Sequence, residues 1–208
     1  MSGEPMTGPS MKASLSLWRS LRDGCEAAQL VEFAVSLPLL VVFVVGIFDF
    51  SSAFTLKQKL TNTARDAARA AASDTITDLS ATPPLSVSDA FWIVDWYFSS
   101  SKLDDCGIAA SPTRSGTTWT YSAKGGKCVG NGLVITINRG YYFPAATTSA
   151  PPDVTCTPQA VNGTTAILAT CVSIQYGYGW RFDRAANLLR ATHLPANITA
   201  VAVAMNEN

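Results

Sequence analysis

The longest apolar run in the sequence lies near the N-terminus and extends from Phe33 to Phe48 without a charged residue. Asp49 follows, and apolar residues continue to Leu56. A helix from Phe33 to Leu56 would be roughly 36 Å long, enough to cross a hydrocarbon core of about 30 Å. The run also exceeds the roughly 7 to 15 apolar residues of a secretory signal, so it should stay attached. The pattern predicts a transmembrane helix over residues 28–56, with a buried core helix as the alternative.

Two later segments repeat apolar residues every three or four positions, the period of an amphipathic helix. The first predicts a stalk helix over residues 57–80, which continues the membrane helix and carries a face of small alanines that allows close packing. The second follows a Pro-containing break and predicts a helix over residues 86–103. Its expected buried face consists of Val87, Phe91, Val94 and Phe98. Residues 1–27, which mix Gly, Pro and Ser with a few charges, are interpreted as a cytoplasmic leader.

From about Gly107 onward the sequence changes to short runs of β-branched and aromatic residues separated by turn-forming stretches. The expected strands lie within residues 117–123, 132–144, 166–180 and 196–206, and a short helix is expected at 184–190. Alternation of apolar and polar residues favours an antiparallel meander over parallel βαβ units. The predicted fold class is therefore α+β, with residues 81–208 forming an extracytoplasmic domain.

The cysteines divide into Cys25, which precedes the apolar run, and an even set of four within the predicted domain. The four are Cys106, Cys128, Cys156 and Cys171. An even set in one domain predicts two disulfides and an oxidising compartment. Three pairings are possible, and proximity favours the first with the second and the third with the fourth. Zinc is disfavoured because no C-x-x-C pair occurs and His193 is the only histidine.

Charge excludes one class of function and complicates the topology. The net charge is zero and 14% of residues are charged, so no basic field exists for nucleic acid. Near the apolar run, Lys and Arg are more frequent after it than before it, which opposes the positive-inside rule. Large domains translocate largely regardless of charge, and the cysteines require oxidation. The N-terminus is therefore expected in the cytoplasm and the C-terminal domain outside it.

Three residues in or beside the apolar segment are candidates for a role other than anchoring. Glu32 stands at its start, where a carboxylate either marks the aqueous boundary or has a function. Pro38 removes an amide donor, so the helix either kinks or accommodates the proline through water or Ser36. Asp49 near the outer end is favoured as a boundary residue over a proton or partner site. Glu32, Pro38 and Asp49 are the candidate assembly residues.

The segment from Glu26 to Ala72 resembles the TadE-like family. Its members share a G-x-x-A-x-V-E-F-A-x-x-L-P head, an acidic residue late in the helix and a stalk similar to Q-x-x-x-N-A-A-R-x-G-A-R. The residues that carry the resemblance are Glu32, Phe33, Ala34, Leu37, Pro38, Gly46, Asp49, Phe50, Leu60, Asn62, Ala64, Arg65, Ala68 and Arg69. The resemblance implies a minor pilin or pseudopilin of the bacterial inner membrane that assembles tight-adherence (Flp-type) pili and supports surface adhesion. A protein of this kind could also enter the surface pilus itself.

The resemblance also implies processing and partners. In such proteins a prepilin-type peptidase removes the leader, with Glu at the fifth mature position and an aromatic residue after it. Counting back from Glu32 places the cut between Ala27 and Ala28, with Phe33 as the aromatic residue; Ala27 stands where Gly is usual. The expected partners are membrane lipid, this peptidase and other pilus-assembly subunits bound through the N-terminal helix.

The predicted domain offers little for catalysis, because it lacks glutamate until Glu207 and contains one histidine. No G-x-S-x-G, H-E-x-x-H or phosphate-binding glycine loop occurs. We therefore predict no enzymatic activity, no cofactor and no metal. The alternative function is a membrane-tethered module that recognises a glycan or protein through exposed aromatic residues. Core packing is favoured for most of its candidates, which are Trp92, Trp96, Trp119, Trp180 and the QYGYGW segment.

Overall fold

The structure is a computed structural model, which describes residues 25–75, 79–144, 155–157, 166–181 and 195–207. The chain divides into two compact units, Met1–Ile47 and Phe48–Asn208. The predicted leader up to residue 24 and the predicted helix at 184–190 lie outside the described residues.

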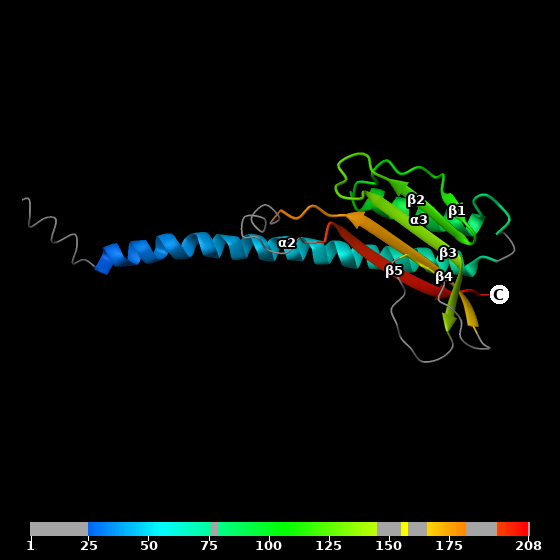
Figure 1. Ribbon diagram of the computed structural model, residues 1–208, viewed down its shortest axis with the longest axis horizontal. Helices are drawn as coiled ribbons and strands as arrows, with labels where there is room; N and C mark the ends of the chain where they lie inside the picture. Colours follow the sequence, from blue (N-terminus) through cyan, green and yellow to red (C-terminus); the bar gives the residue numbers. More distant parts are fainter. Residues whose placement is uncertain (1–24, 76–78, 145–154, 158–165, 182–194, 208) are drawn as a thin grey trace, which may run out of the picture. The chain divides into compact units, whose positions relative to one another are not determined.

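The first described element is helix α2, which spans Cys25–Ser73 and contains Pro38 (Figure 1). Of the described residues, only this helix is long and apolar enough to cross a membrane. Its side chains from Leu30 to Val45 are exposed, as expected for a segment that requires lipid rather than water around it. The expectation of a long N-terminal apolar helix is confirmed.

The C-terminal part of α2 belongs to the second unit and forms part of its core. A stripe at three- and four-residue spacing is buried there: Ala53, Leu56, Leu60, Ala64, Ala67 and Ala71. Alanine side chains let the helix axis approach the sheet closely, as the sequence pattern indicates. The helix ends at Ser73, whereas the stalk was predicted to reach residue 80. At this end the guanidinium of Arg139 donates hydrogen bonds to the carbonyl oxygens of Ala71 and Asp74, which a further helical turn would otherwise supply with donors.

Helix α3 spans Leu85–Ser100 and confirms the second predicted helix. The predicted face is buried, with Val87, Phe91, Val94 and Phe98 each at most 2% exposed. The opposite face carries Trp92 and Trp96, which are 54% and 70% exposed.

Five strands form one antiparallel sheet in the order β1-β2-β3-β4-β5, which confirms the predicted meander. They span Thr113–Ser115, Thr118–Ala123, Leu133–Pro144, Ala166–Gly177 and Asn197–Met205. Alternate residues face the two helices, which cover the same side of the sheet (Figure 1). One row of aligned residues crosses four strands: Tyr121, Ile135, Ile174 and Ala200. The second unit is thus a two-layer α+β domain with its core between helices and sheet.

Tyr121 provides a test of this core. It is 1% exposed and stacks on Phe91 with ring centroids 4.4 Å apart. Burial raises the pKa of Tyr121 to about 12 from an ordinary value of 10.0. The pKa of Tyr121 is higher in the folded protein than in the unfolded chain. Burial of its neutral hydroxyl therefore contributes its full stability below pH 10, and this contribution is lost as the pH rises towards 12.

We expect the free energy of unfolding to fall by about 1.4 kcal/mol more in the wild type than in Tyr121→Phe when the pH rises from 9 to 11. Urea unfolding of the full chain in detergent, at both pH values, measures the difference. Equal losses in the two proteins would show that the Tyr121 hydroxyl does not titrate from a buried state.

Candidate functional site

The predicted processing and assembly residues lie along α2. Ala27 and Ala28 are in its first turn, and Glu32 and Phe33 lie at the start of its third turn. Glu32 and Phe33 are exposed, and Phe33 is 62% accessible. An exposed carboxylate beside an exposed aromatic ring at the start of an apolar helix is available to a partner outside this chain.

Pro38 lies inside α2, and the helix continues on both sides of it. The hydroxyl of Ser36 donates a hydrogen bond of 3.3 Å to the carbonyl oxygen of Phe33. The acceptor that loses its donor to Pro38 is the carbonyl of Ala34, so the Ser36 bond does not replace the missing one. The helix nevertheless continues past Pro38 to Ser73.

Asp49 has different surroundings, because it is 4% exposed and lies in the second unit. The Tyr178 hydroxyl donates to Asp49 Oδ1 at 3.1 Å and lies 3.3 Å from its backbone carbonyl oxygen. Asp49 thus has a partner within the domain, in addition to its place near the end of the apolar run. The sequence did not single out Tyr178 as that partner, although it lies in the aromatic QYGYGW segment.

The pKa of Tyr178 reflects this part-buried hydrogen bond. Burial raises the pKa of Tyr178, and the hydrogen bond and the negative charge of Asp49 raise it further. Arg181 acts in the opposite direction on the same hydroxyl. The Tyr178 hydroxyl is therefore protonated at neutral pH and donates the hydrogen bond that connects the segment after β4 to α2.

Aromatic rings extend the contact between α2 and the segment that follows β4. Trp180 lies 5.4 Å from Phe50 and 4.9 Å from Tyr178 between ring centroids. Its indole N–H donates a 2.7 Å hydrogen bond to the carbonyl oxygen of Pro195. This group joins α2, the end of β4 and the start of β5.

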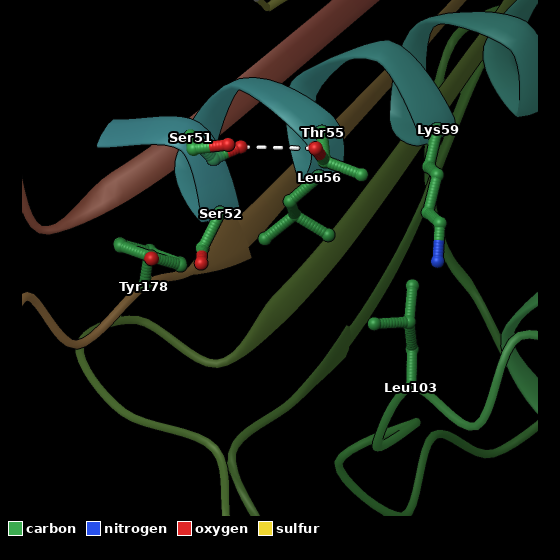
Figure 2. Close-up of a pocket in the computed structure, with 7 residues that line it drawn as sticks. All are labelled: Ser51, Ser52, Thr55, Leu56, Lys59, Leu103 and Tyr178. Atoms are coloured by element: carbon green, nitrogen blue, oxygen red, sulfur yellow. Dashed lines mark hydrogen bonds between the residues drawn. The ribbon is translucent and has the colours of Figure 1, made fainter. Parts of the chain in front are cut away.

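An open cavity of about 390 Å³ lies beside Tyr178 (Figure 2). Its lining consists of Ser51, Ser52, Thr55, Leu56, Lys59, Leu103 and Tyr178. The Thr55 hydroxyl bonds to the Ser51 carbonyl oxygen at 2.9 Å, and the Lys59 side chain extends towards Leu103. The hydroxyls of Ser52 and Thr55 both donate to carbonyl oxygens of α2, and Leu56 and Leu103 supply apolar lining.

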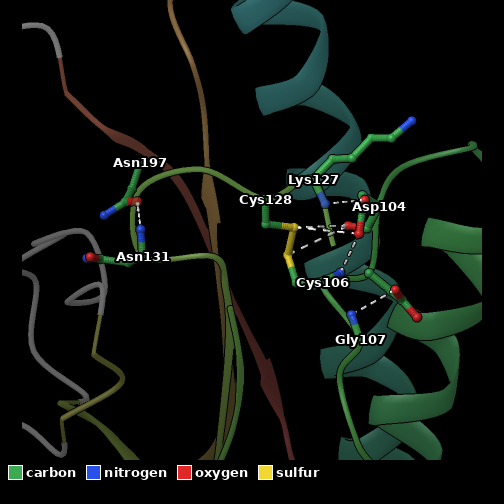
Figure 3. The surroundings of a disulfide bond; sticks show 8 residues. Asp104, Cys106, Gly107, Lys127, Cys128, Asn131 and Asn197 are labelled. Atoms are coloured by element: carbon green, nitrogen blue, oxygen red, sulfur yellow. Dashed lines mark hydrogen bonds between the residues drawn. A yellow bond between two sulfur atoms is a disulfide. The ribbon is translucent and has the colours of Figure 1, made fainter. Parts of the chain in front are cut away.

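The two expected disulfides are present and follow the pairing that proximity favours. Cys106 pairs with Cys128 and Cys156 pairs with Cys171, with sequence separations of 22 and 15. The Asp104 carboxylate accepts backbone N–H bonds from Cys106 and Lys127 on both sides of the first disulfide (Figure 3). These bonds lower the pKa of Asp104. Asp104 and the two sulfurs lie close together, but the sulfurs are bonded to each other and supply no thiolate for a metal.

Each disulfide restricts the unfolded chain by closing a loop. Replacing Cys106 and Cys128 together by alanine should lower the free energy of unfolding by about 3 kcal/mol. Urea unfolding of the full-length protein measures the loss. Adding a reductant to the wild type should lower the free energy of unfolding by more than the double substitution does, because both disulfides are then opened. An unchanged unfolding midpoint in the double variant would contradict a stabilising role for this bond.

Fold and site together define an α+β protein with one apolar N-terminal helix long enough to cross a membrane. Residues 27–69 match the family model described as TadE-like protein, which confirms the resemblance over this segment. The match covers about a fifth of the chain and includes Glu32, Pro38 and Asp49. It implies involvement in tight-adherence pilus assembly. No curated protein and no solved structure matches the chain.

Proposed function

We propose that this chain is a membrane-anchored minor pilin or pseudopilin-like protein that takes part in assembling tight-adherence pili and in the adhesion they support. The observation that carries the proposal is the family match, which falls on the long apolar helix and on the start of its packing against the sheet. The proposed role is structural rather than catalytic, and it requires neither cofactor nor nucleic acid.

The distribution of residues along α2 supports two roles for one helix. Its N-terminal part exposes apolar side chains together with Glu32, which suits insertion into lipid and contact with other subunits. Its C-terminal part is buried beneath the β-sheet through Leu60 and the alanine stripe. Movement of the helix during assembly would therefore be transmitted to the domain, because the second half of the helix belongs to the domain core.

The disulfides support an extracytoplasmic position for the domain. This orientation places the N-terminus in the cytoplasm of a bacterial cell, where a prepilin-type peptidase would act between Ala27 and Ala28. The partners proposed for the exposed part of α2 are lipid and the helices of other pilus-assembly subunits.

Anchoring and orientation are tested by cell fractionation combined with protease treatment of spheroplasts. We expect the chain in the inner-membrane fraction, with the C-terminal domain degraded by external protease and a cytoplasmic marker protected.

Mass spectrometry of the extracted protein should give an N-terminus at Ala28. Recovery in the soluble fraction would contradict the anchor, and an intact Met1 in membrane-bound protein would contradict the proposed cleavage alone.

A further inference from the structure

Exposed aromatic side chains lie on α2 at the beginning of the second unit. Phe48, Phe50 and Phe54 are 71%, 59% and 64% exposed. Trp180 is half-buried against Phe50, and Tyr178 lies edge-on to Trp180. Contiguous apolar surface of this kind on a folded domain indicates contact with a partner or a membrane.

The two larger polar aromatics of this group have their polar atoms bound within the protein. The Trp180 N–H is held by the carbonyl of Pro195, and the Tyr178 hydroxyl is held by Asp49. Tryptophan and tyrosine concentrate at membrane–water interfaces because an apolar ring and a polar edge suit the boundary between acyl chains and headgroups. In this protein the internal bonds hold both rings in place and satisfy their polar atoms, so the rings can lie beside acyl chains without leaving a polar atom unpaired.

The position of these rings along the helix agrees with the thickness of a bilayer. From Phe33 to Phe50 the helix rises roughly 26 Å, close to the hydrocarbon core of about 30 Å. A span that continued to Leu56 would place buried domain residues in lipid, since Ala53 and Leu56 pack in the core with the sheet. The aromatic group thus stands where the lipid-facing segment must end.

Cations lie just beyond the aromatic rings. Arg181 is exposed and close enough to act on the Tyr178 hydroxyl, and Lys59 borders the cavity lined by Ser52 and Tyr178. The carboxylate of Asp49 is buried by contrast. Positive side chains on this boundary match the phosphates of phospholipid headgroups.

We propose that Phe50, Phe54, Tyr178 and Trp180 form an interfacial collar that rests in the phospholipid headgroup layer and fixes the depth of the β domain at the membrane. The collar rests on the proposed membrane anchor and adds the lipid surface as the partner of this part of the domain. A second protein covering the same rings is the competing arrangement, in which Trp180 would not contact lipid.

The test uses full-length protein with Trp18→Phe, reconstituted in vesicles of phosphatidylethanolamine and phosphatidylglycerol. Lipids brominated near the headgroup or near the chain end quench nearby tryptophan fluorescence. We expect the shallow bromines to quench more strongly than the deep ones, and Trp180→Phe to remove most of that quenching. The matched control Trp96→Phe, which alters an exposed tryptophan on α3, should leave the quenching of Trp180 in place.

Quenching that is unchanged by Trp180→Phe would overturn the collar, as would stronger quenching by the deep bromines. Protection of Trp180 from all brominated lipids would also overturn it. Near-UV circular dichroism checks that the variant is folded. Flotation with the vesicles tests the anchor separately: a protein that fails to float contradicts both claims, whereas flotation without quenching of Trp180 contradicts only the collar.

Discussion

Replacing Arg139 with methionine is expected to lower the free energy of unfolding by about 3 kcal/mol. Arg139 is fully buried, and its guanidinium donates to the carbonyl oxygens of Ala71 and Asp74, the latter at 2.8 Å. It also donates to the Thr170 hydroxyl at 2.9 Å. Methionine keeps much of the volume but leaves these acceptors buried without a donor, and it removes a cation from the negative end of the helix dipole.

The effect is measured by urea unfolding of the full chain in detergent, followed by near-UV circular dichroism. Arg65→Met is the matched control, because Arg65 is exposed on α2 and should change the free energy of unfolding by less than about 0.5 kcal/mol. Arg139→Lys should lie between the two, since it keeps the charge and loses the planar fork. Similar midpoints for Arg139→Met and Arg65→Met would show that the C-terminal end of α2 does not depend on the Arg139 side chain.

Replacing Glu32 with glutamine is expected to reduce the number of pili per cell roughly tenfold or more, which corresponds to about 1.4 kcal/mol in an assembly equilibrium. Cleavage before Ala28 would create an amine that pairs with Glu32 of a neighbouring subunit within the apolar helix bundle. Glutamine keeps the shape and removes the charge, so the amine would be desolvated without compensation.

The measurement is electron microscopy of cells that express each variant at equal level, with immunoblotting of the membrane fraction. Asp66→Asn is the control, since Asp66 is an exposed carboxylate on the same helix outside the apolar run. Glu32→Gln cells with wild-type pilus numbers would refute the pairing, and normal membrane levels of the variant exclude loss of the protein as the cause.

The sequence predicted both described helices and four of the five described strands, because each of these follows from a periodic pattern. The three-residue strand β1 is too short to show such a pattern and was not predicted. The apolar run and the alanine stripe indicated α2, and the face containing Phe91 and Phe98 indicated α3. Alternation around Ile135 and Ala200 indicated strands, and short turn-rich connections indicated an antiparallel order. These features depend on neighbours within one segment, which is the information that a sequence contains directly.

The contacts that depend on distant segments could not be predicted. In the sequence, Arg139 is one charge within a predicted strand. In the structure its buried guanidinium donates to a carbonyl oxygen at the C-terminal end of α2. The pairing of β3 with β4 is irregular between Asn138 and Tyr141, the stretch that contains this residue. Asp49 and Tyr178 are separated by most of the domain, so nothing in either local pattern indicates their hydrogen bond. The burial of Ala53 and Leu56, which the predicted membrane helix includes, likewise depends on contacts with the sheet.

The most direct test of the proposed role in pilus assembly is electron microscopy of pili on cells from which this gene has been deleted in frame. The account predicts that such cells lose their tight-adherence pili and regain them when the full-length chain is supplied from a plasmid. Normal pilus numbers on the deletion strain, with the other assembly proteins present at normal levels, would contradict the account.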